Sequence, residues 1–254
     1  MLKLLNIFFI SITISAHPIF AQDQNFRTNT SIAYNSLRFF GLQNDLRSSD
    51  KGMTRLDIKY DTDNSSSQIS FNYDGYDNFI LDRSYLQFSS GIATFGIGAI
   101  ERHWSFSDET SLILSHNTRP FKSIYLNLKN EFKNNWMPAK ANWSLEVFNG
   151  FTKSSLKNGD SMLLGVRAVL SLIEGLDFEL TQTSQWGGKG YDNDISAFSD
   201  ALLFDTNGGS NSNINKMAGF GISYTIPLHT RSLRIYGQII GEDEAGNLPS
   251  CYAY

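Results

Sequence analysis

The sequence has a single cysteine, Cys251, so no disulfide bond can form within the chain. Its stability must therefore come from backbone pairing and side-chain packing rather than from a disulfide framework. After the first 21 residues, no stretch has the length and apolarity of a transmembrane helix. These absences exclude a disulfide-rich scaffold and a helical membrane bundle.

An excess of positive charge is also missing. The chain has 21 Lys and Arg against 25 Asp and Glu, which gives a formal net charge of −4 at pH 7. Phosphate backbones attract proteins through basic patches, and a mildly acidic chain is a poor general binder of nucleic acid. We therefore expect no nucleic-acid partner.

Motifs for metal binding and nucleophilic catalysis are absent as well. His103 and His116 have no nearby cysteine and no short repeated histidine spacing, so they make a weak case for a metal site. No Gly-x-Ser-x-Gly elbow occurs among the many serines. We expect neither a metal nor a cofactor.

One unusual stretch, ERHWSFSDETSLILSHNTRP at residues 101–120, carries three carboxylates that invite a catalytic interpretation. Glu101, Asp108 and Glu109 could supply the acid and base of a glycosidase, which needs two carboxyl groups placed across a glycosidic bond. Nearness in sequence does not supply that geometry, and acidic loop residues are usually solvated. We therefore predict that the protein is not an enzyme and has no catalytic residues.

The amino terminus has the pattern of a secretory signal peptide. Lys3 precedes an apolar run from Leu4 to Ile14, and small residues end the segment at Ala21. A membrane anchor is the alternative, but the run is shorter than the roughly 20 residues that a spanning helix needs. We predict a signal peptide at residues 1–21 and a mature domain at 22–254.

The mature sequence alternates between apolar and polar residues, as β-strands do. In MTRLDIKYD, Leu56, Ile58 and Tyr60 alternate with charged residues. The next run, SQISFNYD, alternates in the same way and is joined to the first by a polar turn at Asp61–Ser67. The two runs predict a β-hairpin.

Similar alternation recurs along the chain, with 20 glycines and 19 phenylalanines that suit a β-rich protein. Clear strands are expected around residues 93–99, 124–128, 143–147, 220–226 and 233–239. Less regular candidates lie at 31–40, 79–88, 161–172 and 176–185. The sum is about ten or eleven amphipathic strands, many of a length that crosses a bilayer when tilted.

One segment departs from this period. In DNDISAFSDALLFD, Ile195, Phe198 and Ala201 have helical spacing behind Asp192 and Asp194, which can cap a helix. We predict a short inserted helix that folds against the mouth of a barrel or into its lumen.

Two architectures fit an alternating all-β chain. A soluble sandwich turns its apolar faces inward onto each other, whereas an outer-membrane barrel turns the apolar face to lipid and keeps a polar lumen. The number of strands, the signal peptide and the lack of disulfides favour an antiparallel transmembrane β-barrel.

Two stretches combine aromatic and polar residues in the way that sugar-binding surfaces do, although interface anchoring also explains single tryptophans in barrels. Flat rings cover the apolar side of a sugar, and polar side chains bind its hydroxyls. The candidate polysaccharide-binding residues are Trp104, Asn117, Arg119, Trp186, Lys189, Tyr191 and Asp192.

Four blocks of the sequence resemble, in order, the Wzi-type capsule assembly proteins. The blocks are SLILSHNTRP (111–120), SQWGGKGYDNDISAFSDALLF (184–204), MAGFGISY (217–224) and IYGQIIGEDE (235–244). The resemblance spans roughly residues 80–250. It implies an outer-membrane barrel of about eighteen strands, of which this chain would cover the first ten or eleven and be incomplete at its carboxyl end. The alternative is that the chain closes as a smaller barrel.

The resemblance also implies a function. Proteins of this family hold capsular polysaccharide at the cell surface without known catalysis, so the expected partners are surface polysaccharide and outer-membrane lipid, with the barrel a monomer. A passive porin and a secreted glycan hydrolase are the alternatives. Arg119 and Lys189 would matter most for an acidic capsule, since the net charge of the chain is otherwise of the wrong sign.

Overall fold

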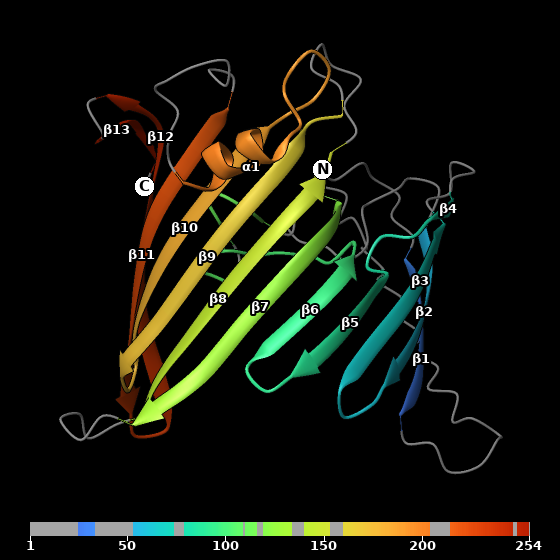
Figure 1. Ribbon diagram of the computed structural model, residues 1–254. Coiled ribbons are helices and arrows are strands. Elements are labelled where there is room, and N and C mark those ends of the chain that lie inside the picture. The colour runs from blue at the N-terminus through green and yellow to red at the C-terminus, as the bar shows by residue number, and fades with distance from the viewer. Residues whose placement is uncertain are drawn as a thin grey trace, which may run out of the picture. The chain divides into compact units, whose positions relative to one another are not determined.

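The computed structural model describes residues 25–33, 53–73, 79–108, 110–115, 119–133, 140–152, 160–203, 214–245 and 248–253. These residues form 13 β-strands and one short α-helix (Figure 1). Within these ranges, no helix combines the length and apolarity needed to cross a membrane. The signal peptide expected at 1–21 lies outside the described residues.

The chain divides into two compact units. The first comprises residues 1–88, 97–101 and 116–120, and the second comprises 89–96, 102–115 and 121–254. In the described residues, the pairings among β1 to β5 and among β7 to β13 are antiparallel. In the first unit β1 pairs with β2, β2 with β3, and β3 with both β4 and β5. These strands are β1 (Phe26–Ala33), β2 (Met53–Asp61), β3 (Ser65–Tyr73), β4 (Phe79–Ile80) and β5 (Tyr85–Ser90).

In the second unit each strand neighbours the next one along the chain, which is the order of a β-meander. Boundaries between the units fall within β5, after Phe88, and within β6 (Ala93–Gly98), after Gly96. The strands that follow are β7 (Lys122–Lys133), β8 (Lys140–Phe151), β9 (Met162–Ile173), β10 (Leu176–Trp186), β11 (Asn215–Leu228), β12 (Arg231–Ala245) and β13 (Leu248–Ala253).

Most of the expected strands are confirmed. The hairpin predicted from residues 54–74 is β2 and β3, with Ile58 opposite Ile69. The strand expected at 31–40 begins earlier, at Phe26, and residues 34–40 lie outside the described part. The single strand expected at 79–88 is wrong. A turn at residues 81–84 divides it into β4 and β5, because Arg83 adopts a left-handed conformation with φ of 74°.

In the first unit the apolar side chains lie on one, exposed face of the strands. Ile69, Phe71 and Phe88 are 51%, 44% and 56% exposed, whereas the opposite face of the strands buries Arg55 and Asn72, whose side chains are hydrogen-bonded at 2.6 Å. We call these the apolar face and the polar face. The sandwich interpretation is wrong, because a soluble sandwich buries its apolar face.

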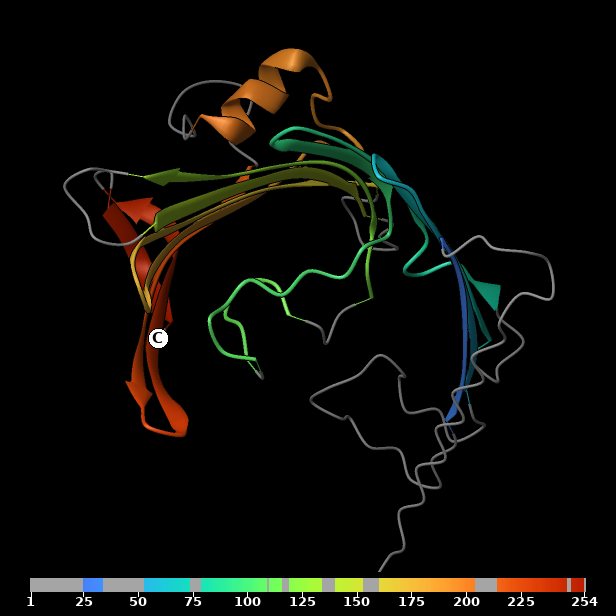
Figure 2. The same cartoon turned by 90° about the horizontal axis from the view of Figure 1, so that it is seen from below.

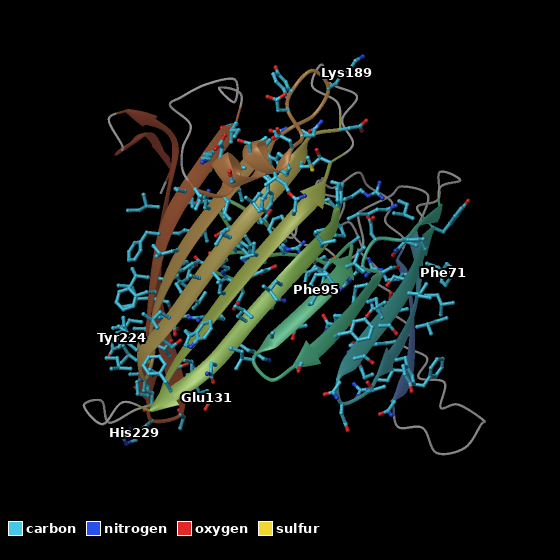
Figure 3. All side chains as sticks on the ribbon, viewed as in Figure 1. Phe71, Phe95, Glu131, Lys189, Tyr224 and His229 are labelled. Carbon is cyan, nitrogen blue, oxygen red and sulfur yellow. The ribbon has the colours of Figure 1, made fainter. Side chains whose placement is uncertain are left out.

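The second unit has the same two faces. Leu180, Phe220 and Tyr224 lie on the apolar face, are well exposed, and belong to paired positions of β10 and β11. Figure 3 shows Tyr224 projecting away from the strands. The polar face of the same strands buries Glu179 and Ser223. This inverted arrangement is typical of a sheet whose apolar side meets lipid.

The inserted helix is confirmed as α1 (Ile195–Leu202). Asp194 is its N-cap, and its Oδ1 accepts a hydrogen bond from Ala197 N at 2.9 Å. The helix packs against Leu164 and Trp186, on the apolar face, near the ends of β9 and β10. It therefore lies at the rim of the sheet, and the alternative position in the lumen is wrong.

Candidate functional site

Residues 102–115 run across the polar face of the second unit. Figure 2 shows this segment, in green, on the concave side of the curved sheet formed by β7 to β12, with α1 on the other side. The segment follows β6 and contains most of the unusual stretch noted in the sequence. It is held to the strands by two polar networks, one around Glu146 and one around Glu179.

Arg102 anchors the start of the segment. Its Nε donates to Glu146 Oε1 at 2.7 Å and its Nη2 donates to Ser123 Oγ at 3.1 Å. The guanidinium carbon lies 4.0 Å from the centre of the Phe148 ring and 5.6 Å from that of Tyr125. Burial lowers the pKa of Arg102 from its usual value, and the Glu146 carboxylate opposes that shift.

Trp104 is buried beside this charge pair, with 1% of its surface exposed. Its Nε1 donates to the second oxygen of Glu146 at 3.1 Å, and its ring meets Phe148 edge to face with centroids 5.4 Å apart. The ring also approaches Gly165, where a Cβ atom would come within 2.7 Å of Trp104 Cη2. Its ring faces are therefore covered by protein in this structure.

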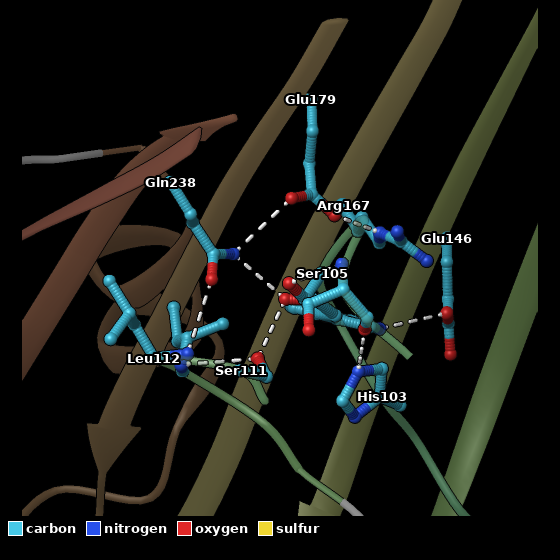
Figure 4. Close-up of polar contacts among 11 residues, drawn as sticks. His103, Ser105, Ser111, Leu112, Glu146, Arg167, Glu179 and Gln238 are labelled. Atoms are coloured by element: carbon cyan, nitrogen blue, oxygen red, sulfur yellow. Dashed lines mark hydrogen bonds and ion pairs between the residues drawn. The ribbon is translucent and has the colours of Figure 1, made fainter. Parts of the chain in front are cut away.

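The second network joins the segment to β9, β10 and β12 (Figure 4). Gln238 donates to Trp104 O at 2.8 Å and to Glu179 Oε2 at 3.3 Å, while its Oε1 accepts from Leu112 N at 3.1 Å. Arg167 Nε donates to the other oxygen of Glu179 at 2.5 Å. The Glu179 carboxylate, although buried, is thus fully hydrogen-bonded.

Trp186 lies on the opposite, apolar face, at the end of β10. It is 5% exposed, its Nε1 donates to Asn149 Oδ1 at 3.1 Å, and its ring meets Phe198 of α1 edge to face at 5.6 Å. The tryptophan thus forms the packing surface for α1. Trp104 and Trp186 occupy opposite faces of the same sheet and do not form one site.

The loop between β10 and α1 carries three of the candidate residues. Lys189 and Asp192 are exposed and Tyr191 is half-buried. Gly188 and Gly190 have positive φ values of 106° and 89°, which glycine adopts without steric cost. The loop is closed by hydrogen bonds from Gly188 N to Asn193 Oδ1 and from Tyr191 N to Gly188 O, at 2.9 and 3.2 Å. It presents a cation, an anion and a phenol ring within four residues.

Arg119 belongs to the first unit. Its Nε and Nη2 donate to the two carboxylate oxygens of Asp82 at 2.7 and 2.9 Å, and 47% of its side chain is exposed. Asp82 is part of the turn 81–84, where Arg83 also forms an ion pair with Glu101 at 3.3 Å. Asn117 lies outside the described residues.

The carboxylates considered for catalysis take other roles in the described structure. Glu101 is paired with Arg83 and Asp108 is exposed, while Glu109 lies outside the described residues. His103 Nε2 lies 2.5 Å from Ser107 O, and His116 is not among the described residues. In the described part of the chain, no three His, Cys, Asp or Glu residues form a group that could hold a metal.

The sequence interpretation missed the residues that hold the segment. Arg167 is the lone charge of the strand MLLGVRAVLSLI, and Glu179 and Glu146 are charges flanked by apolar residues in β10 and β8. A charge on the polar face of a strand, flanked by apolar residues, is the signal that could have identified them. Arg167 and Glu179 lie on consecutive strands, but Arg102, the partner of Glu146, and Gln238, the other partner of Glu179, are distant in the sequence.

Comparison with known proteins gives three findings. The model of the family described as capsule assembly protein Wzi matches residues 18–254. A 55.8 kDa protein in the cps region of Klebsiella pneumoniae is 26% identical over 157 residues, which cover 60% of this chain and 31% of that protein. The fold matches that of Wzi from Escherichia coli, with a TM-score of 0.68 and 20% identity over 90% of this chain and 51% of the Wzi chain. That Wzi is described as an outer-membrane, carbohydrate-binding β-barrel involved in group 1 capsule assembly.

Proposed function

The chain belongs to the Wzi family of capsule assembly proteins, and from this premise we propose that the full-length protein is an outer-membrane β-barrel that binds capsular polysaccharide. It retains the polymer at the cell surface in the manner of a lectin, without chemical change to the glycan. Because the chain spans about half or less of the proteins it matches, this role is assigned to the full-length protein.

The observation that carries the proposal is that the strands expose their apolar face and bury their polar face, the reverse of a soluble protein. Within each unit, large apolar side chains are exposed on one face and charged residues are buried on the other. An apolar surface of this extent needs an apolar environment, because soluble monomers rarely expose one. Lipid supplies it for a barrel whose lumen is polar.

The lengths of the connections suggest which end faces outward. Short turns at 174–175 and 229–230 join β9 to β10 and β11 to β12, whereas residues 187–214 join β10 to β11 at the other end. In outer-membrane barrels the short turns are periplasmic and the long loops extracellular. The loop with Lys189, Tyr191 and Asp192 then lies at the cell surface, where capsule is held.

We assign glycan contact to this loop and to Arg119 and Asn117. Trp104 and Trp186 act as packing residues, since their rings are covered by protein. Lys189 provides positive charge for an acidic polymer, whereas the charge of Arg119 is balanced by Asp82, and Tyr191 provides a ring for the apolar side of a sugar.

The two alternatives fit the structure less well. A passive porin needs an open lumen, and residues 102–115 occupy the concave side of the second unit (Figure 2). A hydrolase that worked from the polar face would need carboxyl groups there that are free to act on substrate, and Glu146 and Glu179 are both bound by arginine side chains.

The test is to replace Lys189, Tyr191 and Asp192 together by alanine in a capsulated strain and to measure cell-bound against released polysaccharide. We expect released polymer to rise while the protein keeps its heat-modifiable gel mobility. Arg231→Ala, at the exposed start of β12 beside the turn at the opposite end, is the control and should retain capsule. Retention by the triple variant, with normal folding, would rule out this loop as the contact.

A further inference from the structure

The helix α1 raises a separate question, because its outer side is apolar and uncovered. Ile195 and Leu203 are 87% and 69% exposed. They lie eight residues apart, with Ser199 midway, so all three share one side of the helix. Ala197 and Ala201, which are buried against the sheet, lie on the other side.

On the face of β10 that carries the helix, the side chains change from apolar to polar where the helix begins to cover the strand. Along the apolar face of β10, Phe178 and Leu180 are followed by Gln182 and Ser184. Leu180 is 61% exposed, whereas Gln182 and Ser184 are 6% and 0% exposed. Polar groups facing hydrocarbon would be costly unless they were hydrogen-bonded.

The end of the helix supplies those hydrogen bonds. Gln182 Nε2 and Ser184 Oγ both donate to Ala201 O, at 3.1 and 2.8 Å. Lys216, from the apolar face of β11, donates to Asp200 O at 2.6 Å. These carbonyls belong to the last turn of the helix, where no intrahelical donor is available, and the lysine charge suits that end.

From this arrangement we infer that α1 is an interfacial helix: it lies along the outer leaflet, and Ile195 and Leu203 contact lipid. The inference rests on the proposed membrane position of the barrel. The helix packs on the same face of the sheet that exposes Leu180, and the step from Leu180 to Gln182 sets the level at which the hydrocarbon ends. Because α1 lies on the convex side of the sheet (Figure 2), it points toward the bilayer and away from the lumen.

The test uses nitroxide labels on single cysteines in the full-length protein, with Cys251 replaced by serine. Labels at Ile195→Cys, Ser199→Cys and Leu203→Cys are compared in lipid vesicles with Leu180→Cys, on the apolar face, and Lys189→Cys, in the exposed loop. For each, collision with lipid-soluble oxygen is measured against collision with a water-soluble nickel chelate.

We expect oxygen to dominate at positions 195 and 203, as at 180, and the chelate to dominate at 189. If 195 and 203 behave like 189 while 180 remains in lipid, the helix is solvated and the inference is wrong. Protection of both positions from both reagents would indicate a protein partner and would also overturn it. If position 180 itself meets the chelate, the membrane position and thus the proposed function fail as well. The three labelled positions share one side, so a single poorly folded variant does not decide the result.

Discussion

Arg102 is held in a setting that water cannot easily enter. Its side chain is 4% exposed and lies between the Glu146 carboxylate and the rings of Phe148 and Tyr125. A buried charge of this kind is stable only when it is paired and hydrogen-bonded. The arginine therefore fixes where residues 102–115 meet the polar face.

Removal of this arginine should loosen the segment. Arg102→Ala leaves Glu146 without its charged partner, and we expect a loss of about 1–3 kcal/mol in the free energy of unfolding. Limited proteolysis should then cut within 102–115 while the barrel keeps its heat-modifiable mobility. Glu146→Gln keeps one carbonyl acceptor but turns an NH2 donor toward the N–H of Arg102 or Trp104, so it should loosen the segment as well. A segment as resistant in Arg102→Ala as in the parent would contradict the anchoring role.

Gly165 is a second sensitive position, because two rings occupy the space of its missing side chain. A Cβ atom there would lie 2.2 Å from Phe148 Cε1 and 2.7 Å from Trp104 Cη2. Gly165→Ala should cost about 1–3 kcal/mol through overpacking. The control is Gly237→Ala in β12, where the new Cβ meets nothing within 4 Å and the change should be within about 0.5 kcal/mol. Equal denaturation midpoints for the two variants in vesicles would refute this packing.

At the scale of the elements, the sequence predicts most of the strands but not the turns that connect them. Alternation of Leu56, Ile58 and Tyr60 with charged residues predicts β2 because side chains of a strand alternate between faces. The capped helical spacing at Ile195 likewise predicts α1. The turn at Arg83 was missed because a left-handed arginine has no local signal in the sequence.

In the candidate site, too, features set by neighbouring residues are predictable from the sequence, whereas features set by residues from distant strands are not. The glycines beside Lys189 mark a loop, which local chemistry predicts. The burial of Trp104 depends on Glu146, Phe148 and Gln238 from distant strands, so one stretch of sequence could not reveal it.

The two faces of β2 should tolerate substitution differently. Ile58 lies on the apolar face, and Ile58→Arg should cost about 2–4 kcal/mol if it sits near the middle of the bilayer. Lys59, on the polar face, forms an ion pair with Asp61 at 3.0 Å with 36% of its side chain exposed. Lys59→Gln should cost less than about 1 kcal/mol. Equilibrium unfolding from lipid vesicles measures both, and equal losses would refute the assignment of faces.

At the scale of the whole molecule, the apolar and polar faces and the family membership support the same proposed function. In the function proposed above, the apolar face places the protein in the outer membrane, the polar face of the second unit holds residues 102–115, and the loop with Lys189, Tyr191 and Asp192 faces the cell exterior. The net charge of −4 does not favour an acidic polymer, so local cations must supply the attraction.

Direct binding of glycan to the purified protein tests this account most directly. The full-length barrel, folded in detergent as judged by heat-modifiable mobility, is titrated with capsular polysaccharide from its own strain and with a neutral dextran of similar size. We predict saturable binding of the capsular polymer, weak binding of dextran, and loss of affinity when Lys189, Tyr191 and Asp192 are replaced by alanine. A correctly folded protein that binds the capsular polymer no better than dextran would contradict the account.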